Sequence, residues 1–578
     1  MNKILNHISK YFNLIMSFVN LALFFSIRMC WSGISKTLGY EKSESLLILY
    51  LPVILCGVFI ILFIVNILLF KLKKDKNTWS YIMNTINVVL FIVIIVIIAL
   101  GAKDYMSYAW PYFFRYCLIA IGILAFSFII FYYPKTFLRD NKIFKYTSLA
   151  LVLLITTGYL TNANINYITY EPVVYIVEDE YQIVFSSNSE SRAWVVIGDD
   201  SNPENYYYDN YQGYNKSYTK VHKISVPMTK LDKTKEYTIH SQKITYRGPF
   251  GGFKGRDISE TYSFSPINTD DGLNYYAISD IHMGTKPSVQ SANHIQDKEL
   301  LILAGDLESM LEFESNAQYA NKIAYEITRG EIPVIYARGN HELKGKYYES
   351  FHNYVGAKGE DFFYRFTFGN VYGLVLDLGE DHDDDYWEYY DLAKFDEYRN
   401  KQLDFVKKEL ESKEYEKYDY RLVVSHIPVP YVNSRHNHKE FKHEMTSLLN
   451  QMDIDLMISG HQHELLVFEP DTVEVNKKLK FNTDYDESGK TIKAYLTDCN
   501  FPTLLVSKRG FTQTDSSKLT SQESQIGLNV IVDFNNKTQD CIYINSKGER
   551  VNIVNPFVEG LTYGDKITFS LETNKSIR

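Results

Sequence analysis

Seven side chains with lone pairs suited to metal ions stand at the ends of apolar, strand-like runs of the sequence. The runs are YYAIS, LLILA, IPVIY, RLVVS and DLMIS, and Asp, Asn or His follows each within a few residues. The seven side chains are Asp280, His282, Asp306, Asn340, His426, His461 and His463. This mixture of carboxylate, carboxamide and imidazole suits manganese, iron or zinc better than calcium.

The chemistry that such a set favours is attack of water on a phosphate ester. A phosphate ester resists attack because its oxygens are negative. Two cations about 3.5–4 Å apart neutralise that charge, hold the phosphoryl oxygens and turn a bridging water into hydroxide at neutral pH. One carboxylate must bridge the cations, and imidazole and carboxamide ligands complete each shell without excess negative charge. We therefore expect two bound divalent or transition metal ions, with manganese, iron or zinc as the candidates, and no covalent enzyme intermediate.

The elements that must position these side chains alternate between strand and helix. Helical stretches at 314–329, 398–413 and 437–451 lie between the strand-like runs. Ligands of open α/β sheets gather outside the carboxyl ends of the strands. Five strand ends should therefore converge on one crevice, within an α/β domain predicted at 272–578.

Taken together, the five polar blocks resemble the signature of the calcineurin-like metallophosphoesterase superfamily. The blocks read Asp280-Ile-His282, Gly305-Asp306, Gly339-Asn340-His341-Glu342, His426 and Gly460-His461-Gln462-His463, in the family's order. Any one of them alone could be a surface turn, a helix N-cap or a core histidine, but five in order at strand ends favour the metal site. The resemblance covers roughly residues 273–510 and implies an α/β sandwich of two mixed β-sheets flanked by helices.

The resemblance also implies a role for each residue. The first metal would be held by Asp280, His282, Asp306 and His463. The second would be held by Asp306, Asn340, His426 and His461, with Asp306 bridging. His341 would face the leaving group as a general acid or hydrogen-bond donor. The implied activity is hydrolysis of a phosphomonoester or phosphodiester by a metal-activated hydroxide. The alternative is an inactive sensor or binding module with this fold at the cell surface, which a missing ligand would favour.

Two branches of the superfamily fit less well. Purple acid phosphatases also place a β-sandwich before this domain, but they have Gly and a Tyr ligand where this chain has His282 and Ser309. The protein Ser/Thr phosphatase branch has, in place of Ser309, an Asp that orients the catalytic histidine. Here His341 must be oriented otherwise, by Glu308 or by the backbone.

Two features near the site allow two interpretations each. The acidic run GEDHDDDYWEYYD at 379–391 could form a rim that selects substrate or stores cations. A solvated, Tyr-packed insertion is the favoured interpretation, because acidic runs are usually solvated. Arg338 could contact a phosphate oxygen or could point away.

Two further regions precede the α/β part. Residues 1–162 carry apolar stretches at about 11–30, 46–70, 79–101, 110–133 and 146–162. Four of them approach or exceed the ~20 residues that a membrane-spanning helix needs, which predicts an all-α transmembrane bundle of about five helices. Alternating runs at 163–271 are separated by turn-rich stretches, and they predict a small immunoglobulin- or fibronectin-like β-sandwich.

The distribution of basic residues predicts how the chain is oriented. Lys and Arg cluster at 71–76 and 135–145, after the second and fourth apolar stretches. The positive-inside rule then places these loops in the cytoplasm and everything after 162 outside. We expect a multi-pass plasma-membrane protein with the bilayer as partner and an extracytoplasmic catalytic domain, for which lipid-linked or cell-envelope phosphate esters are attractive substrates. The net charge of −9 argues against nucleic acid as a partner bound through a basic surface.

Overall fold

The computed structural model describes the chain mainly from residue 165 onward. The described residues are Ile61, Ile64, Ile86 and Val89, together with 165–248, 251–433, 438–463, 465–470, 494–507, 525–552 and 563–577. Apart from those four isolated positions, the predicted membrane spans lie outside the described residues. Within the described part of the chain, no helix has both the length and the apolar character needed to cross a membrane.

The chain divides into two compact units. The first comprises residues 1–165 and 243–256, and the second comprises residues 166–242 and 257–578. All seven predicted metal ligands belong to the second unit.

A 12-stranded mixed sheet has the order β22-β21-β20-β9-β10-β11-β1-β2-β7-β8, with β3 and β6 also paired to β2. Its strands are β1 (Ile168–Val177), β2 (Glu180–Val196), β3 (Tyr206–Tyr208), β6 (Thr219–Pro227), β7 (Glu236–Gly248), β8 (Gly251–Ser263), β9 (Gly272–Ile278), β10 (Leu300–Ala304), β11 (Val334–Ala337), β20 (Ile526–Asp533), β21 (Thr538–Asn545) and β22 (Ile567–Ser570). The neighbours β9, β10 and β11 are parallel. Parallel strands are buried on both faces, so they appear in the sequence as continuous apolar runs.

A six-stranded second sheet has the order β12-β13-β14-β16-β19-β17. Its strands are β12 (Tyr364–Phe368), β13 (Val371–Leu376), β14 (Tyr420–Ser425), β16 (Leu456–Ser459), β17 (Val467–Phe468) and β19 (Thr503–Leu505). The four strands β13, β14, β16 and β19 are parallel to one another. The hydroxyl oxygens of Tyr275 in β9 and Tyr420 in β14 lie 2.9 Å apart, which joins the inner faces of the two sheets.

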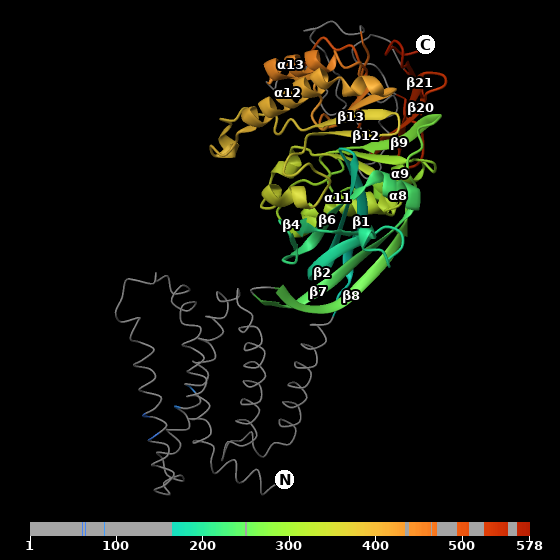
Figure 1. The fold of residues 1–578 in the computed structure, drawn as a ribbon. Coiled ribbons are helices and arrows are strands. Elements are labelled where there is room, and N and C mark those ends of the chain that lie inside the picture. Colours follow the sequence, from blue (N-terminus) through green and yellow to red (C-terminus); the bar gives the residue numbers. More distant parts are fainter. Residues whose placement is uncertain are drawn as a thin grey trace. The chain divides into compact units, whose positions relative to one another are not determined.

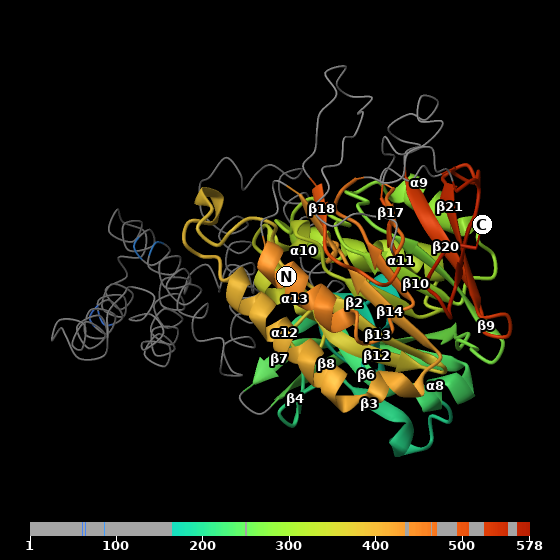
Figure 2. The same ribbon diagram turned by 90° about the horizontal axis from the view of Figure 1, so that it is seen from above.

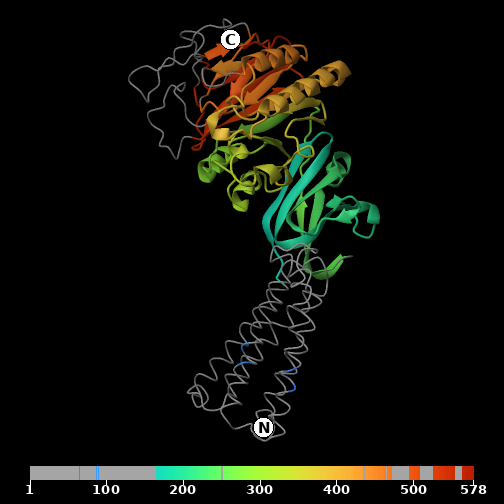
Figure 3. The ribbon, with the colours of Figure 1, turned by 90° about the vertical axis from the view of Figure 1, so that its left-hand side faces the viewer.

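Helices cover the outer faces of the two sheets. Figures 1 and 2 show α12 (Phe395–Ser412) and α13 (Lys439–Leu449) side by side on the second sheet, and Figure 3 shows the same pair in yellow and orange. Leu403 and Met445 of these helices share a buried cluster with Leu374 of β13. α9 (Thr285–Asn293) and α11 (Tyr319–Thr328) pack against the first sheet. The predicted pair of mixed sheets flanked by helices is therefore confirmed. The predicted stretch at 314–329 is divided into α10 (Glu314–Ala317) and α11, and the other two coincide with α12 and α13 apart from their ends.

The remaining described elements are short. They are α8 (Met228–Thr234), α10 (Glu314–Ala317), β4 (Asn210–Tyr211), β5 (Tyr214–Asn215), β15 (Tyr431–Asn433), β18 (Ala494–Leu496) and the 3-10 helices at Pro203–Asn205, His341–Leu343, Tyr348–Asn353, Trp387–Tyr389 and Glu414–Lys417.

The strands that the sequence suggested as a separate β-sandwich share a sheet with the α/β part. β1 pairs in parallel with β11, with Tyr175 opposite Val334. The physical reason is the run from Val173 to Val177, which is buried throughout and needs cover on both faces. The domain boundary expected between 271 and 272 stays a prediction.

A buried polar network fixes the long strand β2 to β6. The Nδ1 atom of His222 lies 3.0 Å from Asp209 Oδ2, and its Nε2 atom lies 2.9 Å from Ser191 Oγ. Lys216 Nζ lies 3.1 Å from the other oxygen of Asp209. The order of contacts resembles a catalytic Ser-His-Asp triad, but Ser191 and His222 are 0% exposed, so we assign the network to packing.

Candidate metal centre

The seven predicted ligands lie on loops that directly follow strands of both sheets. From the first sheet, after β9, β10 and β11, come Asp280, His282, Asp306 and Asn340. From the second sheet, after β14 and β16, come His426, His461 and His463. Because all the strands concerned are parallel within their sheets, their carboxyl ends lie at one edge, where these loops meet.

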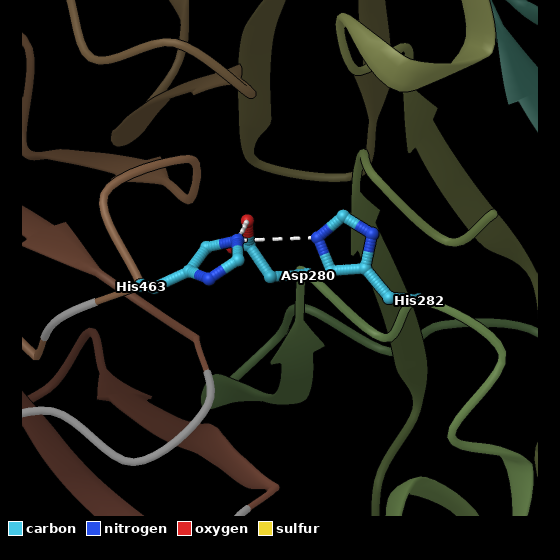
Figure 4. A group of neighbouring side chains, drawn as sticks. All are labelled: Asp280, His282 and His463. Atoms are coloured by element: carbon cyan, nitrogen blue, oxygen red, sulfur yellow. Dashed lines mark hydrogen bonds and ion pairs between the residues drawn. The ribbon is translucent and has the colours of Figure 1, made fainter. Parts of the chain in front are cut away.

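One group of ligand atoms consists of Asp280, His282 and His463. Figure 4 shows the two imidazoles facing each other, with the carboxylate beside His463. The Nε2 atoms of His282 and His463 lie 3.1 Å apart, and His463 Nε2 lies 3.3 Å from Asp280 Oδ1. Asp280 is fully buried and accepts the backbone N–H of His461 at 3.0 and 3.1 Å. One atom from each of the three side chains lies within 4.8 Å of the others, which suits a single cation.

Asp306 lies between this group and the remaining ligands. Its Oδ2 atom is 3.1 Å from His426 Nε2, and it is 3.9 Å from both His282 Nε2 and His341 Nε2. Its carboxylate shares one possible metal group with His282 and His341 and another with His426 and His461. This intermediate place is the one that a bridging carboxylate needs.

The carboxamide of Asn340 and the imidazole of His461 complete the second side. His461 Nδ1 lies 3.2 Å from Asn340 Oδ1. Asn340 Nδ2 donates to Glu380 Oε2 at 3.2 Å, so its oxygen is directed toward His461. The oxygen of Asn340 and the Nδ1 atom of His461 are therefore the atoms that a second cation would meet.

The backbone at the site adopts conformations that most side chains avoid. Five of the seven predicted ligands have positive φ, namely Asp280 (52°), His282 (43°), Asp306 (52°), His461 (72°) and His463 (54°). Such residues concentrate at functional sites, where the surrounding structure holds them in place. The glycines of the signature allow the loops to approach closely. A Cβ atom on Gly339 would lie 2.2 Å from the nitrogen of Asp306, and one on Gly460 would lie 2.6 Å from Asp280 Oδ2.

The charges of the site are coupled. Burial alone would raise the pKa of Asp280, but the neighbouring His463 and His426 lower it below its usual value. Burial would likewise raise the pKa of Asp306, whereas His426 lowers it. Burial lowers the pKa of His426, but the charge of Asp306 raises it to about 10. A cation bound at these atoms would therefore displace a proton from His426.

The hydrogen bonding of the predicted ligands is compatible with bound metal ions. The buried Nε2 atom of His426 has no hydrogen-bond partner among the described residues, although Asp306 Oδ2 is 3.1 Å away. His426 Nδ1 donates to the carbonyl of Ala304 at 2.8 Å, which leaves Nε2 as the atom that would bind a cation once its proton is displaced. A cation shared by Asp306 Oδ2 and His426 Nε2 would take the place of that proton. The number and identity of the ions stay predictions.

His341 is oriented by the backbone. Its Nδ1 atom donates to the carbonyl of Ser309 at 2.8 Å, and its own backbone N–H donates to Asp306 Oδ1 at 2.9 Å. The sequence left Glu308 and the backbone as alternatives for this role. Glu308 instead accepts from Asn316, so the backbone carbonyl holds the ring.

Glu342 joins the loops that carry the ligands. Its carboxylate accepts four backbone N–H groups, from Asp306, Leu307, Glu308 and Gly339. Burial and the nearby Asp306 raise the pKa of Glu342 to about 7, while the backbone donors favour the ionised form. Glu342 is the last residue of the block Gly339-Asn340-His341-Glu342, and the sequence pattern does not indicate these contacts.

The acidic run begins as a buried segment rather than as a solvated insertion. Residues 377–381 are buried, and the exposed part starts only at Asp383. Arg338 points away from the site, because its guanidinium binds Asp377 at 2.6 and 2.8 Å. Asp381 Oδ2 lies 3.2 Å from His461 Nε2. The sequence position of these acidic residues could have indicated that they lie near the site. Asp377, Glu380 and Asp381 closely follow the end of β13, as the predicted ligands follow the ends of their own strands.

Residues 273–465 match the family model described as calcineurin-like phosphoesterase. No curated protein matches the sequence. Among solved structures, the chain is similar to purple acid phosphatase PPD1 from yellow lupin (Lupinus luteus) seeds, with 14% identity, 69% of this chain and 74% of that chain covered, and a TM-score of 0.41. It is similar to PhoD, with 9% identity, 70% and 91% covered, and a TM-score of 0.39. The matched region contains all seven predicted ligands.

Proposed function

We propose that this chain is a metal-dependent hydrolase that cleaves a phosphomonoester or a phosphodiester. The observation that carries the proposal is the convergence of ligand atoms from both sheets into three overlapping groups, each within 4.8 Å. Asp306 belongs to two of these groups and His282 to two, which is the overlap expected of a site for two cations. The calcineurin-like phosphoesterase domain at 273–465 supports the same chemistry.

Each part of the site has a task in this reaction. Bound cations would supply charge neutralisation at the phosphoryl oxygens and would acidify a water molecule. Asp306 holds the two positions together, and Asn340 contributes a neutral oxygen that does not repel the substrate. His341 is 34% exposed, so its Nε2 atom can reach a leaving-group oxygen. Because Nδ1–H is donated to the Ser309 carbonyl, Nε2 carries a proton only when the ring is cationic, and that proton can pass to the leaving oxygen.

The direct test is hydrolysis by the purified full-length chain. Nitrophenyl phosphate and bis(nitrophenyl) phosphate would be offered after loading with manganese, iron or zinc, and bound metal would be measured in the same samples. Asp306→Asn should lose both ions and the activity. Asp385→Asn, which removes the same charge from an exposed residue of the acidic run, should keep both. A full metal complement in Asp306→Asn would overturn the bridging role. Wild type that binds both ions and the esters without turnover would instead be the inactive sensor.

We also propose that the reaction takes place outside the cytoplasm, on lipid-linked or cell-envelope phosphate esters. The support is the pattern of apolar stretches in 1–162 and of basic residues at 71–76 and 135–145. Protease added to intact cells should then cut within 165–578 and spare the segment 71–78. Protection of the whole C-terminal part would reverse the orientation and the substrate pool.

A further inference from the structure

We propose that Glu380 and Asp381 are positioning residues that set the affinity of the second metal position. The inference rests on the proposed function, because it concerns the same site. These two consecutive carboxylates are buried, with 4% and 9% exposure. Each contacts one predicted ligand of the second cation on the atom that faces away from the cation.

Asp381 selects the tautomer of His461. Its Oδ2 atom lies 3.2 Å from His461 Nε2, and the other ring nitrogen, Nδ1, lies 3.2 Å from Asn340 Oδ1. A carboxylate accepts and does not donate, so it favours the tautomer that carries the proton on Nε2. Nδ1 then has the lone pair that would bind the second cation. The negative charge of Asp381 also makes the imidazole a more basic ligand.

Glu380 sets the orientation of the Asn340 carboxamide. Its Oε2 atom accepts from Asn340 Nδ2 at 3.2 Å, which leaves Oδ1 as the atom facing His461. Lys344 Nζ lies 3.2 Å from Glu380 Oε1 and offsets part of its charge. The carboxylate therefore prevents the amide from presenting its NH₂ group, which cannot bind a cation.

The segment that carries the two carboxylates is held rigidly by α12. Arg399 is buried, and its Nη1 atom donates to the carbonyls of Leu378 and Glu380, each at 3.1 Å. Gln402 accepts the backbone N–H of Asp377 at 2.9 Å and donates to the carbonyl of the same residue. Because the backbone is bound on both sides of Gly379, the two carboxylates keep their direction without a bound ligand.

The expected effect falls on one metal position. Groups that accept a hydrogen bond from a metal ligand typically contribute about 10–100-fold to metal affinity. Asp381→Ala should weaken the second position by a factor in this range. Asp381→Asn should weaken it less, since the carboxamide oxygen can still accept from His461 Nε2. Asp385→Asn, four residues along the same run and exposed, serves as the matched control.

The experiment measures the two stepwise dissociation constants of the full-length chain for manganese or zinc, by competition with a chromophoric chelator. Asp381→Ala is combined with His426→Ala, which removes a ligand of the second position, and separately with His463→Ala, which removes a ligand of the first. We expect Asp381→Ala to weaken the remaining ion in the His463→Ala background and to change nothing in the His426→Ala background.

Three results would overturn the proposal. One is affinities in Asp381→Ala that equal those of Asp385→Asn. Another is the same loss in both histidine backgrounds, which would indicate a general structural defect. The third is loss of a complete metal equivalent in Asp381→Ala at saturating metal, which would make Asp381 a ligand. A wild-type chain that binds fewer than two ions would count against the proposed function itself. This outcome is measured on the wild type, so it is distinguishable from the three results above.

Discussion

Replacement of His341 by Ala separates the binding of metal from the protonation of the leaving group. The change removes the imidazole but keeps the backbone N–H that donates to Asp306 Oδ1 at 2.9 Å, so Asp306 should stay in place and both ions should be retained. A general acid contributes about 10²–10⁴-fold to rate, which corresponds to about 2.7–5.5 kcal/mol of barrier. An alkoxide needs the proton and a nitrophenolate does not. The full loss is therefore expected on alkyl phosphates and only a small one on nitrophenyl phosphates.

The assay for this variant is a pair of rate ratios, wild type over His341→Ala, measured on an alkyl and a nitrophenyl phosphate with metal content determined in the same samples. His352→Ala is the matched control, since its Nδ1 atom also lies near a backbone carbonyl, that of Glu349 at 3.1 Å, but outside the site. Equal losses on both esters would refute proton donation, and loss of metal would make His341 a ligand.

Three further predictions concern stability, each read from thermal or denaturant unfolding. At pH 8, Glu342→Gln should leave two of the four backbone N–H groups without an acceptor, which lowers the free energy of unfolding by about 1–3 kcal/mol for each. The exposed control Glu411→Gln should leave the free energy of unfolding unchanged. An equal free energy of unfolding in the two variants would contradict the four contacts of Glu342. Burial raises the pKa of the Asp455 carboxyl to about 7, although Arg421 on β14 lowers it. The protonated carboxyl therefore contributes to stability below the unfolded pKa of about 3.9, and this contribution is lost as pH rises through 7. Asp455→Asn, which cannot ionise, should therefore gain up to about 4 kcal/mol over wild type at pH 8 but less at pH 5. The exposed control Asp404→Asn should give a curve of unfolding free energy against pH that is parallel to that of wild type. Removal of bound metal by a chelator should lower the midpoint of unfolding. A free metal concentration of 100 times the dissociation constant stabilises the folded state by about 2.7 kcal/mol per site. An unchanged midpoint would argue against bound metal.

The positions of the ligands could be predicted because they follow a local rule. Each stands directly after an apolar run, and parallel strands end at one edge of their sheet. Asp381 obeys the same rule after β13, yet it lay within an acidic run and was interpreted as solvated. What distinguishes it is Arg399, which lies on the following helix and binds the backbone of the segment. Such a tertiary contact leaves no local pattern in the sequence.

The arrangement of sheets was predictable only in part. The alternation of strands and helices followed from the order of the runs, and the two mixed sheets followed from the family resemblance. The pairing of β1 with β11 did not, because Tyr175 and Val334 are far apart in the chain and alternation describes a strand without naming its neighbour. The buried contact between Asp209 and His222 has no local signal either, since Asp209 lies between β3 and β4 and His222 lies on β6.

The carbonyl that orients His341 affects how this site can change in evolution. A point mutation replaces a side chain, but it never deletes a peptide carbonyl. Codon 309 is therefore free to drift among residues that keep the loop conformation, and Ser309→Ala should leave the ring where it is. Selection at this position acts on the path of the chain rather than on the identity of a residue. A comparison of sequences that scores position 309 by residue type would rate it as dispensable, although its carbonyl holds the ring of His341.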